Sequence, residues 1–581
     1  MKTQQMNNNT KHPPFINIVY KLGLRDTETG VGYFSCSPMK EVSFEESIEY
    51  LRAHPYDTFM HKHLLDIIAK FDDAKMMQII KEAKQDDYTL LALLYETSLL
   101  YDKFTLTKKY FKSEETKKLS AYTPLNFIKS SLLDDHDLHS KWIAVFKSNI
   151  FDHKPLPAPD DIKIPLLFGK EKLSEIRGNS VHIREIYDKI AGNCSKEDKC
   201  SPPLKTTAQH ALNKLIEYNL LTDTEMRHES SLSPFGLLRK WHIGYSVRNS
   251  RHNYIFLGDQ TSYGKGLSLD TARASYSMEI VERRSSFTGF NSEGSFDFVK
   301  QYPLTHATHE DLIKDGKNAL NPNNLVLETP YNNEALFWLE GEQQCGRNIQ
   351  PILLPAQCVF LFCNLDEINL FSGLGSTGLA SGNTIEGAKI SALLEIIERE
   401  SEGVSLYDPS RCFMLEAEDP VIADLLEDYK TKGISVQFQD ITQPFGVPCY
   451  KCFVVSQNGE IVKGTGANLD GKKALISALT ETPYPYPNGS ASAPGPDGLP
   501  MLRFENLPDY STGNPVKDLA ILESLLMANN YKPLYVNLTR KDLGIPVVKA
   551  LIPGMEMISD FDRFSRVNPR LFANYLQLFQ S

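Results

Sequence analysis

The chain has 581 residues and a formal net charge of −11, with 41% hydrophobic and 23% charged residues. This is the composition of a folded globular protein, and the length predicts two to four domains. The acidic balance argues against general nucleic-acid binding. Residues 1–14 show no apolar signal-peptide stretch, and the most apolar run, 352–365, is too short to span a membrane and is a candidate buried strand. Nine scattered cysteines are typical of a cytosolic protein, so we expect a cytoplasmic protein with no nucleic-acid or membrane partner.

The N-terminal quarter of the chain is predicted to be mainly helical. We expect residues 1–14 to form a disordered tail, followed by two strand candidates, residues 16–24 and 31–37. From Ser43 onward apolar residues recur at helical spacing, and Ser43 with Glu46 forms a capping-box signature. We therefore predict a mainly helical domain over 15–150 with a docking or scaffold role.

A proline-rich stretch follows this region. Its prolines favour extended backbone and resist packing, so residues 151–175 are predicted to be a linker. From 176 to 581 strand-like and helix-like segments alternate. This mixture predicts one α/β domain of about 400 residues, or two fused halves.

A twenty-residue pattern occurs twice in that part of the chain. Residues 266–285 are GLSLDTARASYSMEIVERRS, and residues 382–401 are GNTIEGAKISALLEIIERES. Without gaps they agree at eight positions, which are Gly266/Gly382, Ala272/Ala388, Ser275/Ser391, Glu279/Glu395, Ile280/Ile396, Glu282/Glu398, Arg283/Arg399 and Ser285/Ser401. Each copy is a glycine turn followed by a helix that ends in Glu-x-x-Glu-Arg.

The spacing predicts a cation site. Positions i, i+3 and i+4 share one helix face, so Glu279, Glu282 and Arg283 lie together, as do their counterparts in the second copy. Two such helices would gather four carboxylates, which need cations, and Mg²⁺ commonly bridges carboxylates and phosphates. The glycine turns free N–H groups at helix N-termini, where anions bind, and Lys265 adds positive charge. Solvated, salt-bridged helix faces would explain either copy alone, and the recurrence favours a shared site.

The two segments SYGKGLSLDTARASYSMEIVERRS and GLASGNTIEGAKISALLEIIERES closely resemble the core motifs of YcaO-domain proteins, and LYVNLTRKDLGIPVVKALIPGMEM resembles the C-terminal strand region of that family. The resemblance covers roughly residues 205–580. It implies a mixed α/β fold of YcaO type with an internal repeat, preceded here by the small, mainly helical N-terminal domain.

The resemblance also implies cofactors and roles. YcaO proteins bind ATP and Mg²⁺ and phosphorylate the carbonyl oxygen of a peptide backbone amide that a nucleophile has attacked. Mg²⁺ would be held by four residues, Glu279, Glu282, Glu395 and Glu398. Phosphates would be contacted, or those carboxylates ordered, by Lys265, Arg283, Asn383 and Arg399. Lys205 and Thr207 could also reach the nucleotide.

Two positions depart from the family pattern. Gly387 stands where the second motif usually carries a metal-site glutamate, and Tyr486 stands where a phosphate-binding arginine is expected. The helix around residues 474–481 is predicted to stop at Glu481, before a proline-rich insert that could be a substrate loop or a lid. A rebuilt site, a site completed by a partner, and a site without ATP chemistry all remain open.

These features lead to competing hypotheses. The first is an enzyme that makes a thioamide, or else an azoline, in a ribosomally made peptide. The C-terminal sequence lacks the Pro-x-Pro-x-Pro ending of azoline-forming members, and no E1-like or peptide-clamp domain is evident in the chain. Both observations favour a stand-alone member that works with a separate partner, as in thioamidation with a TfuA-like protein, and an E1-like or peptide-clamp partner stays open. The second is a silent accessory protein that assists another modification enzyme, for example one that methylthiolates a ribosomal protein. The third is a structural α/β protein with salt-bridged helices. Family members often form homodimers.

Overall fold

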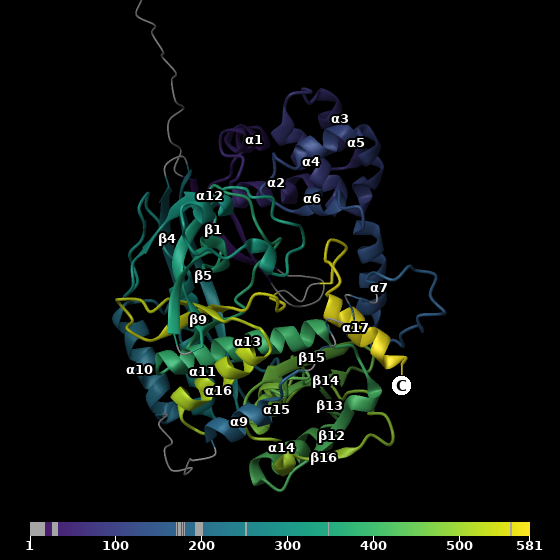
Figure 1. Cartoon of the computed structure of the whole chain (residues 1–581), viewed down its shortest axis with the longest axis vertical. Helices are drawn as coiled ribbons and strands as arrows, with labels where there is room; N and C mark the ends of the chain where they lie inside the picture. The colour runs from purple at the N-terminus through teal and green to yellow at the C-terminus, as the bar shows by residue number, and fades with distance from the viewer. Residues whose placement is uncertain are drawn as a thin grey trace, which may run out of the picture.

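The computed structural model describes most of the chain, namely residues 18–25, 33–169, 171, 173, 176, 178, 180–191, 202–249, 252–346, 348–557 and 561–580. It confirms a mixed α/β architecture. Helices of the N-terminal region lie at the top of Figure 1, two sheets lie below them, and a third sheet lies at the bottom, with helices α11 and α13 crossing the middle. The predicted tail over 1–14 lies outside the described residues.

The first sheet unites the N-terminal segment with the middle of the chain. Its strand order is β2-β1-β5-β4-β3. The strands are β1 (Ile18–Arg25), β2 (Tyr33–Pro38), β3 (Met226–Arg227), β4 (Phe235–Asn249) and β5 (His252–Gly266). Strand β1 runs parallel to β5, with Ile18 opposite Tyr254. The predicted strands near the N-terminus therefore belong to a sheet shared with the repeat region.

Eight described helical segments follow, of which α2 packs directly on β2 of this sheet. They are α1 (Phe44–Ala53), α2 (Thr58–Ile68), α3 (Asp73–Glu82), α4 (Tyr88–Leu100), η1 (Asp102–Tyr110), α5 (Ser113–Leu119), α6 (Phe127–Ser131) and α7 (His136–Asp152). The capping box of Ser43 and Glu46 is present at α1. One continuous cluster of buried side chains contains Leu64 of α2, Phe256 of β5 and Phe360. The domain boundary near residue 150 stays a prediction, because the N-terminal helices share this core with the sheet.

The proline-rich segment after α7 is packed rather than free. Its carbonyls accept hydrogen bonds from the hydroxyl of Tyr575 at Pro157 (2.8 Å) and from Nε1 of Trp142 at Pro165 (2.9 Å). Its apolar side chains join the cluster formed by α7 and α17 (Pro569–Leu578). Extended backbone leaves carbonyls unpaired within the segment, so neighbouring helices can bind them.

The second sheet has the order β10-β9-β17-β18-β11, and β8 pairs with β9. Its strands are β8 (Thr305–Ala307), β9 (Leu336–Cys345), β10 (Asn348–Pro355), β11 (Leu379–Ser381), β17 (Leu534–Asn537) and β18 (Val547–Leu551). The strand predicted over 352–365 is wrong beyond Pro355, where the 3-10 turn η3 (Ala356–Cys358) begins. Apolar runs do not by themselves distinguish strands from buried loops.

The third sheet has the order β15-β14-β13-β12-β16. Its strands are β12 (Cys412–Glu416), β13 (Gln437–Asp440), β14 (Cys449–Val455), β15 (Ile461–Ala467) and β16 (Met501–Arg503). The remaining small elements are β6 (Gly294–Ser295), β7 (Tyr302–Pro303), η2 (Pro322–Asn324), η4 (Pro409–Arg411) and η5 (Phe504–Asn506). The remaining helices are α9 (Ile183–Ala191), α10 (Leu204–Glu217), α11 (Leu269–Ser286), α12 (His309–Lys314), α13 (Ile385–Val404), α14 (Pro420–Thr431), α15 (Gly471–Glu481) and α16 (Pro515–Ala528). No described helix has the length and apolar content that crossing a bilayer requires.

The repeat is threefold in structure. Strands β5, β11 and β15 each lead into a helix, and the three N-cap residues are Ser268, Thr384 and Asp470. Glycines in two of these strands let the helix lie directly on the backbone. A Cβ at Gly264 would stand 1.9 Å from the carbonyl oxygen of Ala272, and one at Gly466 would stand 2.3 Å from that of Ala474. Only glycine permits this approach.

We expect Gly264→Ala to lower the free energy of unfolding by about 2–4 kcal/mol, because the new methyl group meets rigid helix backbone. Gly23→Ala is the matched control, since Gly23 lies in β1 of the same sheet and a Cβ there has no atom within 4 Å. Its effect should stay within about 0.5 kcal/mol. Denaturant unfolding of both variants measures the difference, and equal stabilities would contradict the close approach.

Candidate active site

The two predicted helices meet at the start of the second repeat. The hydroxyl of Ser381, at the end of β11, donates to the carbonyl of Met278 in α11 (3.0 Å). The backbone of Ser381 also hydrogen-bonds Glu282. The first turn of the second copy therefore lies against the last turns of the first copy, in the middle of Figure 1.

In the first copy the carboxylates are half-buried and surround Arg283. Nε of Arg283 lies 3.6 Å from Glu279, and its Nη1 lies 3.8 Å from Glu282. Glu279 also accepts a hydrogen bond from the backbone N–H of Tyr263 (3.1 Å). Burial, followed by the negative charges of Glu395 and Glu279, raises the pKa of Glu282 to about 8 despite the opposing effect of Arg283. The carboxylates of the two copies thus interact, as the repeat predicts.

The second copy uses its glutamates in the same way. Glu395 accepts a hydrogen bond from the backbone N–H of Gly378 (3.0 Å), the residue before β11. This contact corresponds to the one that Glu279 makes with Tyr263 of β5 in the first copy. Glu398 accepts from Oγ1 of Thr465 and from the N–H of Ala467, both at 3.2 Å on β15. In each copy the first glutamate therefore binds its own strand segment, and the second binds the strand of the next unit.

Burial also raises the pKa of Glu398 to about 8. Its neighbour Arg399 pairs with Glu402 (3.1 Å), and Lys463 pairs with the same carboxylate (3.0 Å). Lys463, Arg399 and Lys451 hold the pKa of Glu402 at about 2, against the effect of burial. Arg399 is thus paired with Glu402, one helical turn further along α13, while its charge also acts on Glu398 and Glu395.

Lys549 is a site residue that the sequence analysis missed. It lies on β18, is 2% exposed, and donates from Nζ to the carbonyl of Thr377 (2.6 Å). Burial lowers its pKa to about 8, while the nearby carboxylates of Glu395 and Glu282 act in the opposite direction. A lone lysine in the apolar strand IPVVKALIP was the available signal, since buried lysines need a charged partner.

Glu481 is the second missed residue. Nζ of Lys265 lies 2.6 Å from its carboxylate, and the charge of Glu481 contributes to the raised pKa of Glu279. Glu279, Glu395 and Glu481 each stand eleven residues after the N-cap of their helix. This spacing was the signal, although the third unit lacks the Glu-x-x-Glu-Arg ending. Helix α15 ends at Glu481, as predicted.

The turn before α13 is tied to α10. Oδ1 of Asn383 accepts from Oγ1 of Thr207 (3.1 Å), so the predicted residues Asn383 and Thr207 are in contact. At Gly387, a Cβ would meet only Oγ1 of Thr384, at 3.5 Å. The backbone at Gly387 therefore has room for a Cβ atom.

Tyr486 belongs to a hydrophobic cluster instead of the site. It is buried against Tyr429 and its hydroxyl hydrogen-bonds Asp428. The insert that contains it is also packed, with Ser492 donating to Gly433 and Asn488 donating to Glu229. These contacts make the insert a packed segment in this structure, and the phosphate-binding arginine of the family has no counterpart at Tyr486.

The donor set fits Mg²⁺ held together with a nucleotide. No three His, Cys, Asp or Glu side chains among the described residues are placed to hold a metal by themselves. Mg²⁺ usually takes one or two carboxylates and completes its shell with phosphate oxygens and water. The four half-buried glutamates supply hard oxygen donors, and their raised pKa values indicate that the positive charges nearby do not fully compensate their burial. These properties suit a Mg²⁺ ion that is bound by carboxylates and phosphates together.

We expect Glu282→Gln to stabilise the unliganded protein at pH 8 by about 1–3 kcal/mol and to change little at pH 4. The pKa of Glu282 is raised to about 8 in the folded state from its ordinary value of 4.5. The protonated side chain therefore makes its whole contribution to the free energy of unfolding below pH 4.5, and this contribution is lost as the pH rises through 8. Glutamine does not titrate. Denaturant unfolding at both pH values tests this, with Glu427→Gln on the exposed face of α14 (side chain 69% exposed) as control. An equal gain at both pH values would refute the charge explanation.

The chain is similar to several known proteins. The family model described as YcaO cyclodehydratase, ATP- and Mg²⁺-binding, matches residues 263–484 and 483–556. An uncharacterised protein of Methanothermobacter thermautotrophicus is 30% identical over 342 residues, 52% of this chain and 84% of its own. A Rhizobium leguminosarum bv. trifolii protein, described as lying in the tfuA 3′ region, is 24% identical over 237 residues, 38% of this chain and 53% of its own.

Two solved structures are also similar. YcaO from Methanopyrus kandleri, bound with AMPPCP and Mg²⁺, aligns with a TM-score of 0.45 and 21% identity over 63% of this chain and 94% of its own. A heterocyclase in complex with substrate and cofactor aligns with a TM-score of 0.46 and 19% identity over 60% of this chain and 52% of its own. The family model spans half of the chain and contains the eight predicted metal- and phosphate-site residues, whereas Lys205 and Thr207 lie outside it. The chain therefore belongs to the YcaO family, and its cofactors are ATP and Mg²⁺.

Proposed function

We propose that this protein uses ATP to activate a backbone amide of a ribosomally made peptide and that the product is a thioamide. The observation that carries the enzyme assignment is the cluster of four half-buried glutamates with Arg283 and Lys549 between three sheets. Such a cluster is unfavourable by itself and becomes favourable with a bound cation and phosphates.

The residues divide into two groups by charge. Glu279, Glu282, Glu395 and Glu398 would hold Mg²⁺, with Glu481 as a further oxygen donor. Arg283, Arg399, Lys265 and Asn383 would contact phosphates or order the carboxylates, and Lys549 adds a cation from β18. ATP supplies the phosphoryl group, and Mg²⁺ balances its charge. Arg283 can bind a phosphate in a bidentate manner because its guanidinium is planar and permanently charged.

The chemistry requires a nucleophile and a leaving group. Sulfide adds to the amide carbon, the former carbonyl oxygen takes the phosphoryl group, and loss of phosphate with a proton leaves a carbon–sulfur double bond. A relative described as lying in the tfuA 3′ region supports a TfuA-like partner for the sulfide step. Azoline formation, with an E1-like or peptide-clamp partner, is the alternative outcome, and a homodimer is compatible with either. The seven described cysteines are free thiols, which supports a cytoplasmic location.

A silent accessory protein is the second candidate function. It is favoured by Tyr486, which fills a hydrophobic cluster where the family carries a phosphate-binding arginine. An accessory of this type would bind another modification enzyme, such as one acting on a ribosomal protein, without turning over ATP. Nucleotide turnover separates the two candidates.

We expect Glu282→Gln and Glu398→Gln each to lower ATP turnover by about a hundredfold or more, because each removes charge from the cation site. Circular dichroism should show an unchanged fold, and Glu427→Gln should retain full turnover. Mass spectrometry of the peptide with added sulfide gives the product, since a thioamide exchanges oxygen for sulfur and an azoline loses one water. Full turnover in either site variant would overturn the metal assignment, and no turnover in the native chain with its peptide and a TfuA-like partner would favour the accessory role.

Binding of a non-hydrolysable ATP analogue with Mg²⁺ should release protons. Glu282 and Glu398, with pKa values near 8, are mostly protonated at pH 7 and must lose their protons to bind a cation. The affinity should therefore rise at least about fiftyfold between pH 6 and 8, because a carboxyl with a pKa near 8 is about 1% ionised at pH 6 and half ionised at pH 8. Titration calorimetry in buffers of different ionisation enthalpy measures the released protons. Heats that do not depend on the buffer, together with a flat pH profile, would contradict the coupling.

A further inference from the structure

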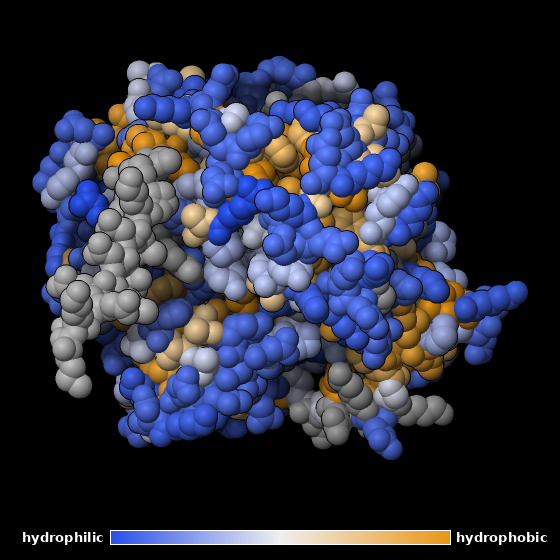
Figure 2. All heavy atoms as spheres, turned by 90° about the horizontal axis from the view of Figure 1, so that it is seen from above, coloured by the Kyte–Doolittle hydropathy of each residue, from blue (hydrophilic) through white to orange (hydrophobic). Residues whose placement is uncertain are grey.

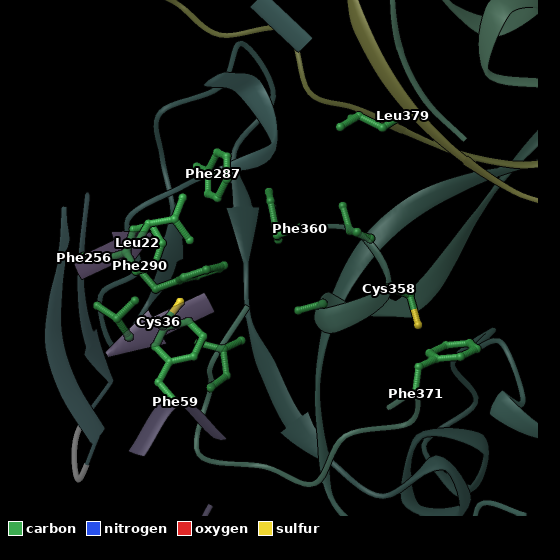
Figure 3. Close-up of a cluster of buried hydrophobic side chains, with 14 of the residues drawn as sticks. Leu22, Cys36, Phe59, Phe256, Phe287, Phe290, Cys358, Phe360, Phe371 and Leu379 are labelled. Carbon is green, nitrogen blue, oxygen red and sulfur yellow. The ribbon is translucent and has the colours of Figure 1, made fainter. Parts of the chain in front are cut away.

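A cavity of about 580 Å³ lies between the N-terminal helices and the loop that follows η3. Its walls are mostly apolar. Figure 3 shows Phe59 of α2 and Cys36 of β2 on one side, Phe371 on the other and Phe360 between them, and all four line the cavity. The volume falls within the range of about 300–1,000 Å³ that is usual for ligand pockets.

The two walls are joined by hydrogen bonds that fix the shape of the cavity. The N–H of Thr58 donates to Asn364 (3.0 Å), its hydroxyl donates to Asn369 (3.2 Å), and the N–H of Asn369 donates to the carbonyl of Pro124 (2.8 Å). The far wall is therefore held by the N-terminal region, and the cavity is preformed.

One cation faces the cavity. Lys62 lines the cavity and is open to solvent there. The protein that surrounds it lowers the pKa of its ammonium group by displacing water. An ammonium has three N–H groups, and one of them donates to the carbonyl of Ser372 (3.1 Å), leaving donors for a ligand. The negative charges of Asp66 and Glu328 lie close enough to offset that of Lys62. The wall thus suits a neutral acceptor, such as a peptide carbonyl, better than an anion.

The cavity adjoins the active site through two short pieces of chain. In η3, Gln357 lines the cavity, whereas the next residue, Cys358, lies near enough to Lys549 for the lysine charge to act on the pKa of its thiol. At the cavity mouth, Gly375 is two residues from Thr377, whose carbonyl binds Lys549, and this separation is at most about 7 Å along the chain. Gly378 then donates to Glu395.

We propose that this cavity binds a large apolar side chain of the substrate peptide, with Lys62 bound to a carbonyl of that peptide, next to the amide that the active site activates. The inference rests on the proposed function, and it assigns to the N-terminal helices one wall of the substrate site. Substrate selection then depends on an aromatic or large aliphatic residue near the modified amide.

The test is selection from a displayed library of random ten-residue peptides, with and without Mg²⁺ and a non-hydrolysable ATP analogue. Gly373→Trp and, independently, Gly375→Trp place an indole at the mouth, where a Cβ at either glycine has no atom within 4 Å. Gly169→Trp on the proline-rich segment is the matched control, since a Cβ there is equally free.

The native chain and Gly169→Trp should enrich peptides with one large apolar residue at a fixed position, and both mouth variants should lose that enrichment. Lys62→Met should weaken binding of the selected peptides about tenfold without changing the preferred side chain. Equal enrichment in all variants, enrichment without an apolar position, or no enrichment by the native chain would each overturn the inference.

Calorimetry with the nucleotide on the same proteins separates this inference from the proposed function. The mouth variants should bind the Mg²⁺ nucleotide as the native chain does, because neither glycine touches the glutamate cluster. If nucleotide binding fails in the native chain while enrichment still depends on the mouth, only the proposed function is refuted. If the nucleotide binds in all variants and enrichment ignores the mouth, only the cavity inference is refuted.

Discussion

The accumulation of negative charge between α11 and α13 is the constraint on which the surrounding structure depends. Buried carboxylates are tolerated only when cations or N–H donors compensate for lost water. Here the first sheet supplies the N–H of Tyr263, the second supplies Gly378 and Lys549, and the third supplies Ala467. The three sheets therefore meet at the glutamates because each contributes a donor to them. The pKa values near 8 show that this compensation is incomplete without ligand.

The threefold unit explains how one chain builds this arrangement. Each strand ends in a capped turn that starts a helix, and the glutamate eleven residues after the cap returns to the strand side of the unit. In the first two units, the second glutamate of the helix binds the strand of the next unit, at Ser381 and at Ala467. The third unit has no such glutamate, since α15 ends at Glu481 and Pro483 follows. The series therefore closes with Lys265 of the first unit paired to Glu481 of the third.

The sequence was informative wherever a feature is local. The repeat predicted both helices and four glutamates on their shared faces, and the capping signature at Ser43 predicted the start of α1. It was uninformative wherever a feature depends on distant pairing. Lys549 lies at the site because β18 pairs with β11. Strand β1 belongs to a sheet because it pairs with β5, more than 200 residues later in the chain. Residues 356–365 were apolar enough to predict a strand, yet they form a turn and a loop whose side chains line a cavity.

The position of the N-terminal helices decides what kind of role they can have. A docking module that folds by itself would have its own core, whereas α2 and α4 contribute to the cluster that also contains side chains of β4, β5 and α11. Figure 2 shows the molecule from above, where hydrophilic atoms predominate and apolar areas are visible between them. Buried side chains of α2 and α4, such as Leu64 and Leu93, thus share a core with the sheet and with Phe371 of the loop before β11. The same loop contains Asn369, which binds Thr58 of α2, and continues into Gly378, which binds Glu395, so one segment of chain contacts both an N-terminal helix and a carboxylate of the candidate active site.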